Sequence, residues 1–191
     1  MPNDRRRQGF NVDRDWAVPR GTAFSCAPDK MASMTERKCT SKQMGDACEM
    51  LVAAEMTLAG VPALKVPDNW PSYDVIAQPG GGGKPQKISV KSRTYRRRGR
   101  GDTASYNIAD DFDWLAIVLL PGDDQPKRRT FIVPRSAADE RAHRDSPTAK
   151  TADLRWWWLD QVLSELAEFE NNFTLSITGR SGTQNSDNCS N

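Results

Sequence analysis

The segment FDWLAIVLL, residues 112–120, constrains the fold more than any other stretch of this chain. Its last six residues are all aliphatic, so a strand formed there has no polar face and must be covered on both sides. A run this short cannot cross a bilayer, which requires about 20 residues. The segment therefore predicts a buried strand at the centre of a sheet that has other elements packed on both faces.

Several shorter segments have the composition of further strands. A loop of four glycines, Gly80–Gly83, separates two of them and favours a hairpin connection. Proline interrupts the first segment and ends the fourth, and the last is expected to be an edge strand. The expected strands are VPALKV (61–66), DVIAQ (74–78), KISVK (87–91), RTFIVP (129–134) and TLSIT (174–178).

Helical patterns lie on both sides of these strands. Thr40 and Gln43 form a capping-box pair, and Gly60 is a stop signal, which predicts a helix over 41–59. A short helix is expected over 136–143 and a longer one over 152–169. The first helix is expected to bury one apolar face, made by Met44, Ala47, Leu51, Ala54 and Leu58.

Three consecutive tryptophans, Trp156, Trp157 and Trp158, fall in the last predicted helix. Consecutive helical residues cannot share one face, so at least one of the three is expected in the core. The order of a helix, several strands and further helices predicts an α/β fold with a mixed central β-sheet flanked by helices. One domain over 40–178 is expected, with a mostly disordered extension at 1–39 and a disordered polar tail at 179–191.

Composition excludes several functional classes. The four cysteines form no CxxC pair and no zinc-ligand spacing, so reduced thiols in a cytoplasmic protein are expected. His143 is the only histidine, which leaves no Ser-His-Asp or Cys-His arrangement. The segment after the N-terminal arginines is not apolar, so a soluble protein with no membrane partner is expected.

Two charged residues lie in neighbouring predicted strands, Asp74 in DVIAQ and Lys91 in KISVK. A buried charge is costly without a partner, so the two form an ion pair or share a metal site. The preceding helix carries a second stripe, Gly45, Glu49, Val52 and Met56, in which Glu49 is the charged member. Glu49 and Asp74 would repel each other unless a cation lay between them. Helical periodicity alone does not separate Glu49 from Glu55.

Three short motifs resemble the PD-(D/E)xK nuclease superfamily, in particular its branch of a group I intron homing endonuclease and Holliday-junction-resolvase-like proteins. They are GDACEMLVAAEM (45–56), PSYDVI (71–76) and ISVKS (88–92). They follow the family's order of a helix with a GxxxE opening, a strand with Asp after a proline-containing turn, and a strand ending in lysine. The resemblance covers about 41–120 and implies a restriction-endonuclease-like core.

The resemblance implies a role for each matching residue. Glu49 becomes the helix acid, Asp74 the central metal ligand and Lys91 the catalytic lysine, with the backbone carbonyl of Val90 as a further ligand. Ser89 stands where the family has Glu or Gln, which removes one negative charge and leaves open an inactive module that only binds nucleic acid. The implied cofactor is Mg²⁺, with Mn²⁺ as a substitute.

The implied activity is phosphodiester hydrolysis in DNA, with RNA as an alternative substrate and a homodimer as the expected assembly. An arginine-rich run directly follows Lys91, and its anchoring near the proposed site favours contact with a nucleic-acid backbone over a plain solvated loop. A structural domain in which Asp74 and Lys91 merely pair remains the third possibility. The expected DNA-binding residues are Arg93, Arg96, Arg97, Arg98 and Arg100.

Overall fold

The computed structural model describes residues 39–95, 103–122 and 125–177. The expectations of an N-terminal extension over 1–39 and a polar tail over 179–191 fall almost entirely outside these ranges, as do Arg96, Arg97, Arg98 and Arg100. Within the described residues, no helix combines the length and apolar character needed to cross a membrane.

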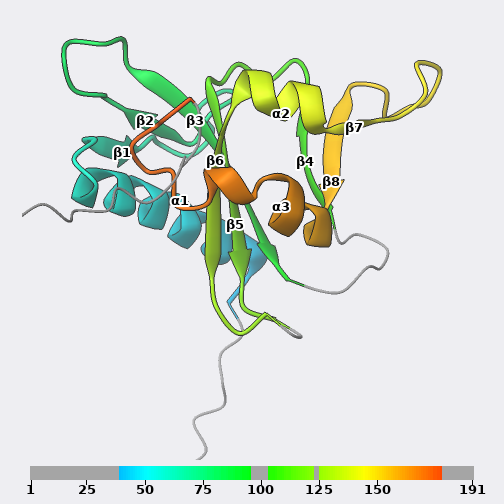
Figure 1. Ribbon diagram of the computed structural model, residues 1–191, viewed down its shortest axis with the longest axis horizontal. Coiled ribbons are helices and arrows are strands. Elements are labelled where there is room, and N and C mark those ends of the chain that lie inside the picture. Colours follow the sequence, from blue (N-terminus) through cyan, green and yellow to red (C-terminus); the bar gives the residue numbers. More distant parts are fainter. Residues whose placement is uncertain (1–38, 96–102, 123–124, 178–191) are drawn as a thin grey trace, which may run out of the picture. The chain divides into compact units, whose positions relative to one another are not determined.

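A five-stranded mixed sheet forms the centre of the fold (Figure 1). The strands lie in the order β1 (Ala63–Lys65), β2 (Val75–Ala77), β3 (Gln86–Thr94), β5 (Trp114–Leu120) and β6 (Arg129–Pro134). Strands β3 and β5 are parallel, and the other neighbours are antiparallel. Strand β5, from the segment that the sequence predicts to be central, is buried at Trp114–Leu119. The α/β class and the mixed sheet are confirmed.

The parallel strands β3 and β5 are connected through a second sheet. This sheet is antiparallel, in the order β4 (Thr103–Asn107), β8 (Leu154–Trp158) and β7 (His143–Arg144). A parallel pair needs a crossover of a dozen or more residues, and here a strand lies within that crossover where a helix is usual. The segment TASYN that forms β4 was not anticipated, because it is short and mostly polar or small.

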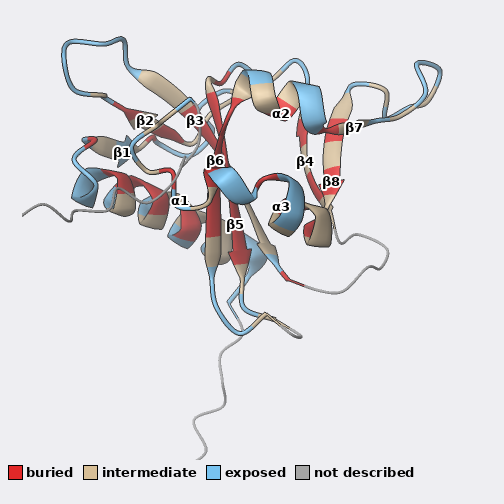
Figure 2. Ribbon diagram, viewed as in Figure 1, coloured by how far each residue is buried: buried red, intermediate tan, exposed pale blue. Residues whose placement is uncertain are grey.

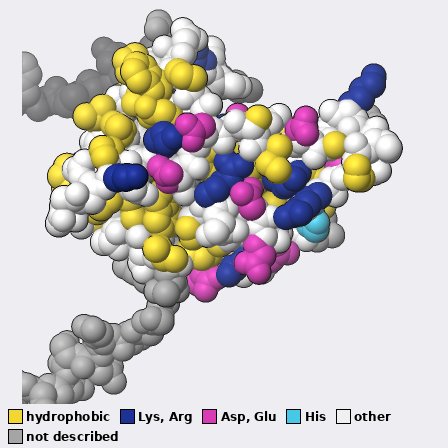
Figure 3. All heavy atoms as spheres, turned by 90° about the horizontal axis from the view of Figure 1, so that it is seen from above, with side chains coloured by type: hydrophobic (Ala, Val, Ile, Leu, Met, Phe, Trp, Pro, Cys, Tyr) yellow, Lys and Arg dark blue, Asp and Glu magenta, His cyan; other side chains and the backbone are white. Residues whose placement is uncertain are grey.

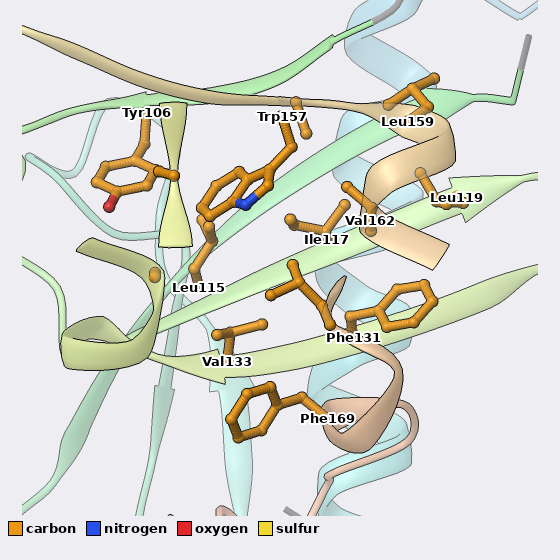
Figure 4. Packing of buried hydrophobic residues seen from close by; sticks show 14 of the residues in the cluster. Tyr106, Leu115, Ile117, Leu119, Phe131, Val133, Trp157, Leu159, Val162 and Phe169 are labelled. Atoms are coloured by element: carbon orange, nitrogen blue, oxygen red, sulfur yellow. The ribbon is translucent and has the colours of Figure 1, made fainter. Parts of the chain in front are cut away.

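Two apolar layers cover the two faces of the central sheet, and the buried positions follow them (Figure 2). Helix α1 (Ser41–Leu58) packs on one face. The other face is covered by the second sheet together with α2 (Arg135–Arg141), α3 (Leu159–Glu165) and the 3-10 turn η1 (Ala167–Phe169). Figure 4 shows Trp157 of β8 pointing into the apolar layer on this other face, among side chains of β5. Burial on both faces explains why β5 carries no polar residue.

Helix α1 begins and ends as the sequence predicts. The Gln43 N–H donates to the Thr40 hydroxyl at 3.2 Å, and the Thr40 N–H donates to the Gln43 side chain at 2.9 Å. Gly60 has φ +88°, a conformation that favours glycine. The predicted buried face is wrong, however, because Ala47, Ala54 and Leu58 are exposed. The buried residues are Cys48, Val52, Ala53 and Met56.

Glu49 therefore lies beside the buried face of α1. The stripe that packs on the sheet is the one that contains Val52 and Met56, which are both buried. Two apolar stripes on one helix made the choice ambiguous in the sequence. The face that packs joins an apolar cluster that includes Val75 of β2 and Ile88 of β3.

The long helix predicted over 152–169 is wrong at its start. Residues 154–158 form β8, in which Trp157 is buried while Trp156 and Trp158 lie together on the opposite face with ring centroids 5.4 Å apart. Alternation along a strand, and not the turn of a helix, separates the three rings. The predicted edge strand at 174–178 is also absent over its described part, 174–177. Leu175 has φ +58°, which a strand cannot accommodate.

Candidate active site

Asp74 lies directly before β2, at the point where β3 extends beyond its neighbour. The Val90 N–H donates to Asp74 Oδ2 at 2.6 Å, and the Asp74 N–H donates to the Ile88 carbonyl at 2.9 Å. The preceding loop turns sharply, since Asn69 and Ser72 have φ values of 66° and 73° without being glycine. The carboxylate is therefore fixed by backbone contacts on β3, which a free surface aspartate would lack.

Ser89 and Val90 of β3 both lie beside Asp74. Ser89 is 1% exposed, and its hydroxyl lies 3.4 Å from Asp74 Oδ2, beyond the usual range for an O–H···O bond. Ser89 therefore packs against Asp74 and does not face solvent. Because the N–H and C=O of one strand residue point to the same side, the Val90 carbonyl faces the Asp74 side of β3.

Glu49 of α1 and Asp74 line the same cavity, which holds about 140 Å³ and lies between α1 and the ends of β1 and β2. Glu55 does not line it and instead forms an ion pair with Arg128 at 3.1 Å. Of the two glutamates that helical periodicity left open, Glu49 is the one that lines this cavity.

A network of charges fills the same cavity. Lys65 Nζ lies 3.0 Å from Glu49 Oε2, 2.8 Å from Asp68 Oδ1 and 3.3 Å from Asp46 Oδ1. Lys42 lies 2.6 Å from Asp68 and 3.2 Å from Asp46. Asp74 is the only one of the four cavity carboxylates that has no ammonium group of a described residue within 4.0 Å.

The proton affinities of these groups follow from the contacts. Hydrogen bonds from Lys42 and then Lys65 lower the pKa of Asp68 to about 2. The hydrogen bonds to Asp68 and Glu49 raise the pKa of Lys65, and those to Asp68 and Asp46 raise the pKa of Lys42. Both lysines are therefore firmly protonated at neutral pH.

Lys91 and Arg93 lie further along β3. Lys91 does not line the cavity and forms no ion pair with Asp74 or with any other described carboxylate, so the simple ion-pair interpretation is wrong. The Arg93 Nε donates to the Thr103 carbonyl at 3.0 Å, and its Nη1 donates to the Ser92 carbonyl at 2.8 Å. Arg93 thus joins β3 to β4, in addition to any contact with a ligand.

The donor atoms of this cavity suit a hard cation. Among the described residues no group of three His, Cys, Asp or Glu side chains is arranged to hold a metal. Two cavity carboxylates, Glu49 and Asp74, are nevertheless available, and the Val90 carbonyl lies on the Asp74 side of β3 although Val90 does not line the cavity. Mg²⁺ is commonly held by one or two carboxylates and keeps several waters, so this donor set fits Mg²⁺ better than a metal that needs a full protein cage.

Sequence reasoning missed Lys65, together with Asp46, Asp68 and Lys42. Lys65 was treated as part of a short apolar strand, VPALKV. Its spacing to Asp68, three residues on, was a weak local signal. The contacts to Asp46 and Glu49 join β1 to the preceding helix α1, and no local spacing pattern predicts them.

Comparisons with known proteins give limited likenesses. No protein-family model matches this sequence, and a comparison with curated proteins finds no match. Among solved structures, a bacterial homing endonuclease is similar with a TM-score of 0.36 and 19% identity, over 50% of this chain and 70% of that one. The Holliday junction resolvase Hjc of the archaeal hyperthermophile Archaeoglobus fulgidus is similar with a TM-score of 0.36 and 17% identity, over 57% and 86%.

Proposed function

We propose that this protein is a metal-dependent endonuclease that hydrolyses phosphodiester bonds in DNA. The observation that carries the proposal is the Asp74 carboxylate, which Val90 holds at 2.6 Å in the cavity that Glu49 also lines. A carboxylate fixed by a backbone N–H at a strand end, beside a second carboxylate from a helix, is a preorganised set of oxygen ligands. The order of motifs in the sequence supports the same function.

Asp74, Glu49 and the Val90 carbonyl would hold the metal ion. The chemistry supplied by a bound Mg²⁺, or by Mn²⁺ in its place, is polarisation of the scissile phosphate and activation of water. Asp74 would bind through Oδ1, since Oδ2 accepts the Val90 N–H. Ser89 would support the Asp74 side chain and would not itself be a ligand, since it is buried.

Lys91 would stabilise negative charge that develops on the phosphate. It follows Val90 on the same strand and is half-buried, and no described carboxylate neutralises it. An ammonium group that has no protein counter-ion keeps its charge available for a phosphate oxygen. Lys65, which has three carboxylate partners, cannot offer this.

Contact with the DNA backbone would come from the arginine run after β3. Figure 3 shows basic and acidic side chains interspersed on one face of the described residues, without a large patch of one sign. Arg93 is partly committed to backbone carbonyls through Nε and Nη1, and no described residue accepts a hydrogen bond from its Nη2. Arg96, Arg97, Arg98 and Arg100 would supply the remaining, sequence-independent and salt-sensitive affinity.

The proposal is tested by incubating the protein with supercoiled plasmid and with branched DNA, in Mg²⁺, Mn²⁺ or EDTA, beside Lys91→Ala. We expect cutting that requires the metal and that the variant loses. Lys84→Ala, in the exposed loop between β2 and β3, is the matched control and should cut as the parent does.

Binding without cutting would instead support a catalytically inactive nucleic-acid-binding module. Its affinity would fall with salt, and replacing Arg96, Arg97 and Arg98 together would reduce the slope of log affinity against log salt by about 2.7 for duplex DNA. A protein that neither cuts nor binds DNA or RNA would overturn both functions.

A further inference from the structure

Lys65 is the most highly coordinated charge in the cavity. It extends from β1, the strand next to Asp74, and the Val66 N–H donates to the Asp74 carbonyl at 3.0 Å. Its ammonium group lies within 3.3 Å of three carboxylates, Asp46, Glu49 and Asp68. Its side chain is 21% exposed, so the ammonium group is partly shielded from water.

Asp46, Glu49 and Asp68 surround one ammonium group, and with Lys65 among them these described carboxylates are not arranged to hold a metal ion. Carboxylates this close repel one another unless a cation lies between them, and here an ammonium group meets that need. Lys42 supports Asp46 and Asp68 from the more exposed side but does not contact Glu49. Lys65 is thus the only described cation within 4.0 Å of Glu49.

The contact with Lys65 gives the two carboxylate oxygens of Glu49 different surroundings. Oε2 is paired with Lys65, whereas Oε1 accepts no hydrogen bond from a described residue. Carboxylates that bind metals are themselves commonly oriented by hydrogen bonds from neighbouring groups. The Lys65 contact can therefore fix the Glu49 side chain while one of its oxygens stays available to a ligand.

We propose that Lys65 is a positioning residue that acts as the cavity's internal cation. It holds Glu49 Oε2 so that Oε1 can serve the metal ion at Asp74. It also fills the place among Asp46, Glu49 and Asp68 that a second divalent ion would need, so the site binds a single ion. The inference rests on the proposed function, because it assumes that a metal ion binds at Asp74.

Removing the charge of Lys65 should change the number of ions bound. In Lys65→Met, Asp46 and Asp68 keep only Lys42 as a described counter-ion and Glu49 keeps none, which leaves a vacancy for a second divalent ion. Cleavage should fall by about 10- to 100-fold, because Glu49 loses the contact that orients it. Loss of a merely structural lysine would not raise the number of bound ions while weakening catalysis.

The experiment counts Mn²⁺ ions bound to the full chain by electron paramagnetic resonance, without DNA. It compares the parent with Lys65→Met, Lys65→Gln, Lys65→Arg, Lys42→Met and Asp74→Asn. Circular dichroism checks that each variant is folded, and two neutral Lys65 variants are included in case one of them does not fold. We expect one ion in the parent, two in the neutral Lys65 variants, and one in Lys65→Arg and Lys42→Met.

The outcomes separate the inference from the proposed function. One ion in the neutral Lys65 variants, or two ions in the parent, would overturn the role of Lys65 while leaving the Asp74 site intact. An ion count in the parent that does not depend on Asp74 would overturn the proposed function and this inference with it. Rescue of the single-ion state by Lys65→Arg supports a role of the charge itself.

Discussion

The apolar layer around Trp157 and the charged cavity beside Asp74 are built from different interactions. Against one face, the second sheet and α3 bury aromatic and aliphatic side chains around Trp157, which is 0% exposed. The α1 side of the sheet has an apolar layer of its own, and beside it, near the ends of β1 and β2, Lys42 and Lys65 meet several carboxylates in a partly open cavity. The first region has few polar groups, and the second has few apolar ones.

We expect the apolar layer to determine the stability of the fold and the charged cavity to determine its chemistry. Apolar burial contributes most of the free energy of folding, whereas exposed ion pairs contribute little. Substitutions around Trp157 should therefore act on stability, and substitutions in the charged cavity should act on metal binding and cleavage. Each prediction below tests this separation.

The largest expected effect is on stability. Trp157→Ala should lower the free energy of unfolding by about 3–5 kcal/mol, because it leaves a large cavity between the sheets. Trp156→Ala is the control, since Trp156 is half-buried on the outer face of β8. Urea unfolding followed by circular dichroism would measure both, and equal losses would show that the inner layer is not the main core.

The next effect is on catalysis. Glu49→Gln should lower the cleavage rate by about 10- to 100-fold, the range typical for groups that tune a metal site. Glu55→Gln is the matched control on the same helix, because Glu55 pairs with Arg128 outside the cavity. Single-turnover cleavage of plasmid DNA would measure the rates. Equal rates for the two variants would remove Glu49 from the site.

A smaller effect on stability is expected at the start of α1. Thr40→Ala removes the hydroxyl that accepts the Gln43 N–H and should cost about 1 kcal/mol of folding stability. Thr40→Ser keeps the hydroxyl and should restore most of the loss. Thermal unfolding would compare the three proteins, and a loss that serine does not restore would contradict the capping role.

The smallest effect is expected at the rim of the cavity. Lys42→Met removes two ion pairs, but the Lys42 side chain is 68% exposed and water screens these contacts. The melting temperature should stay within experimental error of the parent. A large decrease in thermal unfolding would show that the charged cavity also stabilises the fold.

The sequence predicted the parts of the fold that depend on local patterns. The continuous apolar run identified β5, the Gly80–Gly83 loop identified the β2–β3 hairpin, and Thr40 with Gln43 identified the start of α1. Each of these features is encoded within a few neighbouring residues. Asp74 was predicted as the first residue of a strand over 74–78, and it lies directly before β2.

The parts that the sequence missed depend on contacts between distant segments. β8 pairs with β4, and Trp156 donates to Asp145 at 3.2 Å while stacking near His143, so tertiary partners override a helical pattern. The buried face of α1 was missed because either of two stripes could pack. The three carboxylates around Lys65 come from α1 and a loop, and no spacing in the sequence reports them.

The central claim is that the cavity around Asp74 is a nuclease site. The most direct test is cleavage of supercoiled plasmid by the parent and by Asp74→Asn across a Mg²⁺ titration, with thermal unfolding of both proteins. We predict Mg²⁺-dependent cutting by the parent. The cleavage rate of Asp74→Asn should be lower by more than about a hundredfold, which exceeds the loss expected for a group that only supports a metal ligand, and its melting temperature should equal that of the parent. Equal cutting by both proteins, or cutting that persists in EDTA, would contradict the claim.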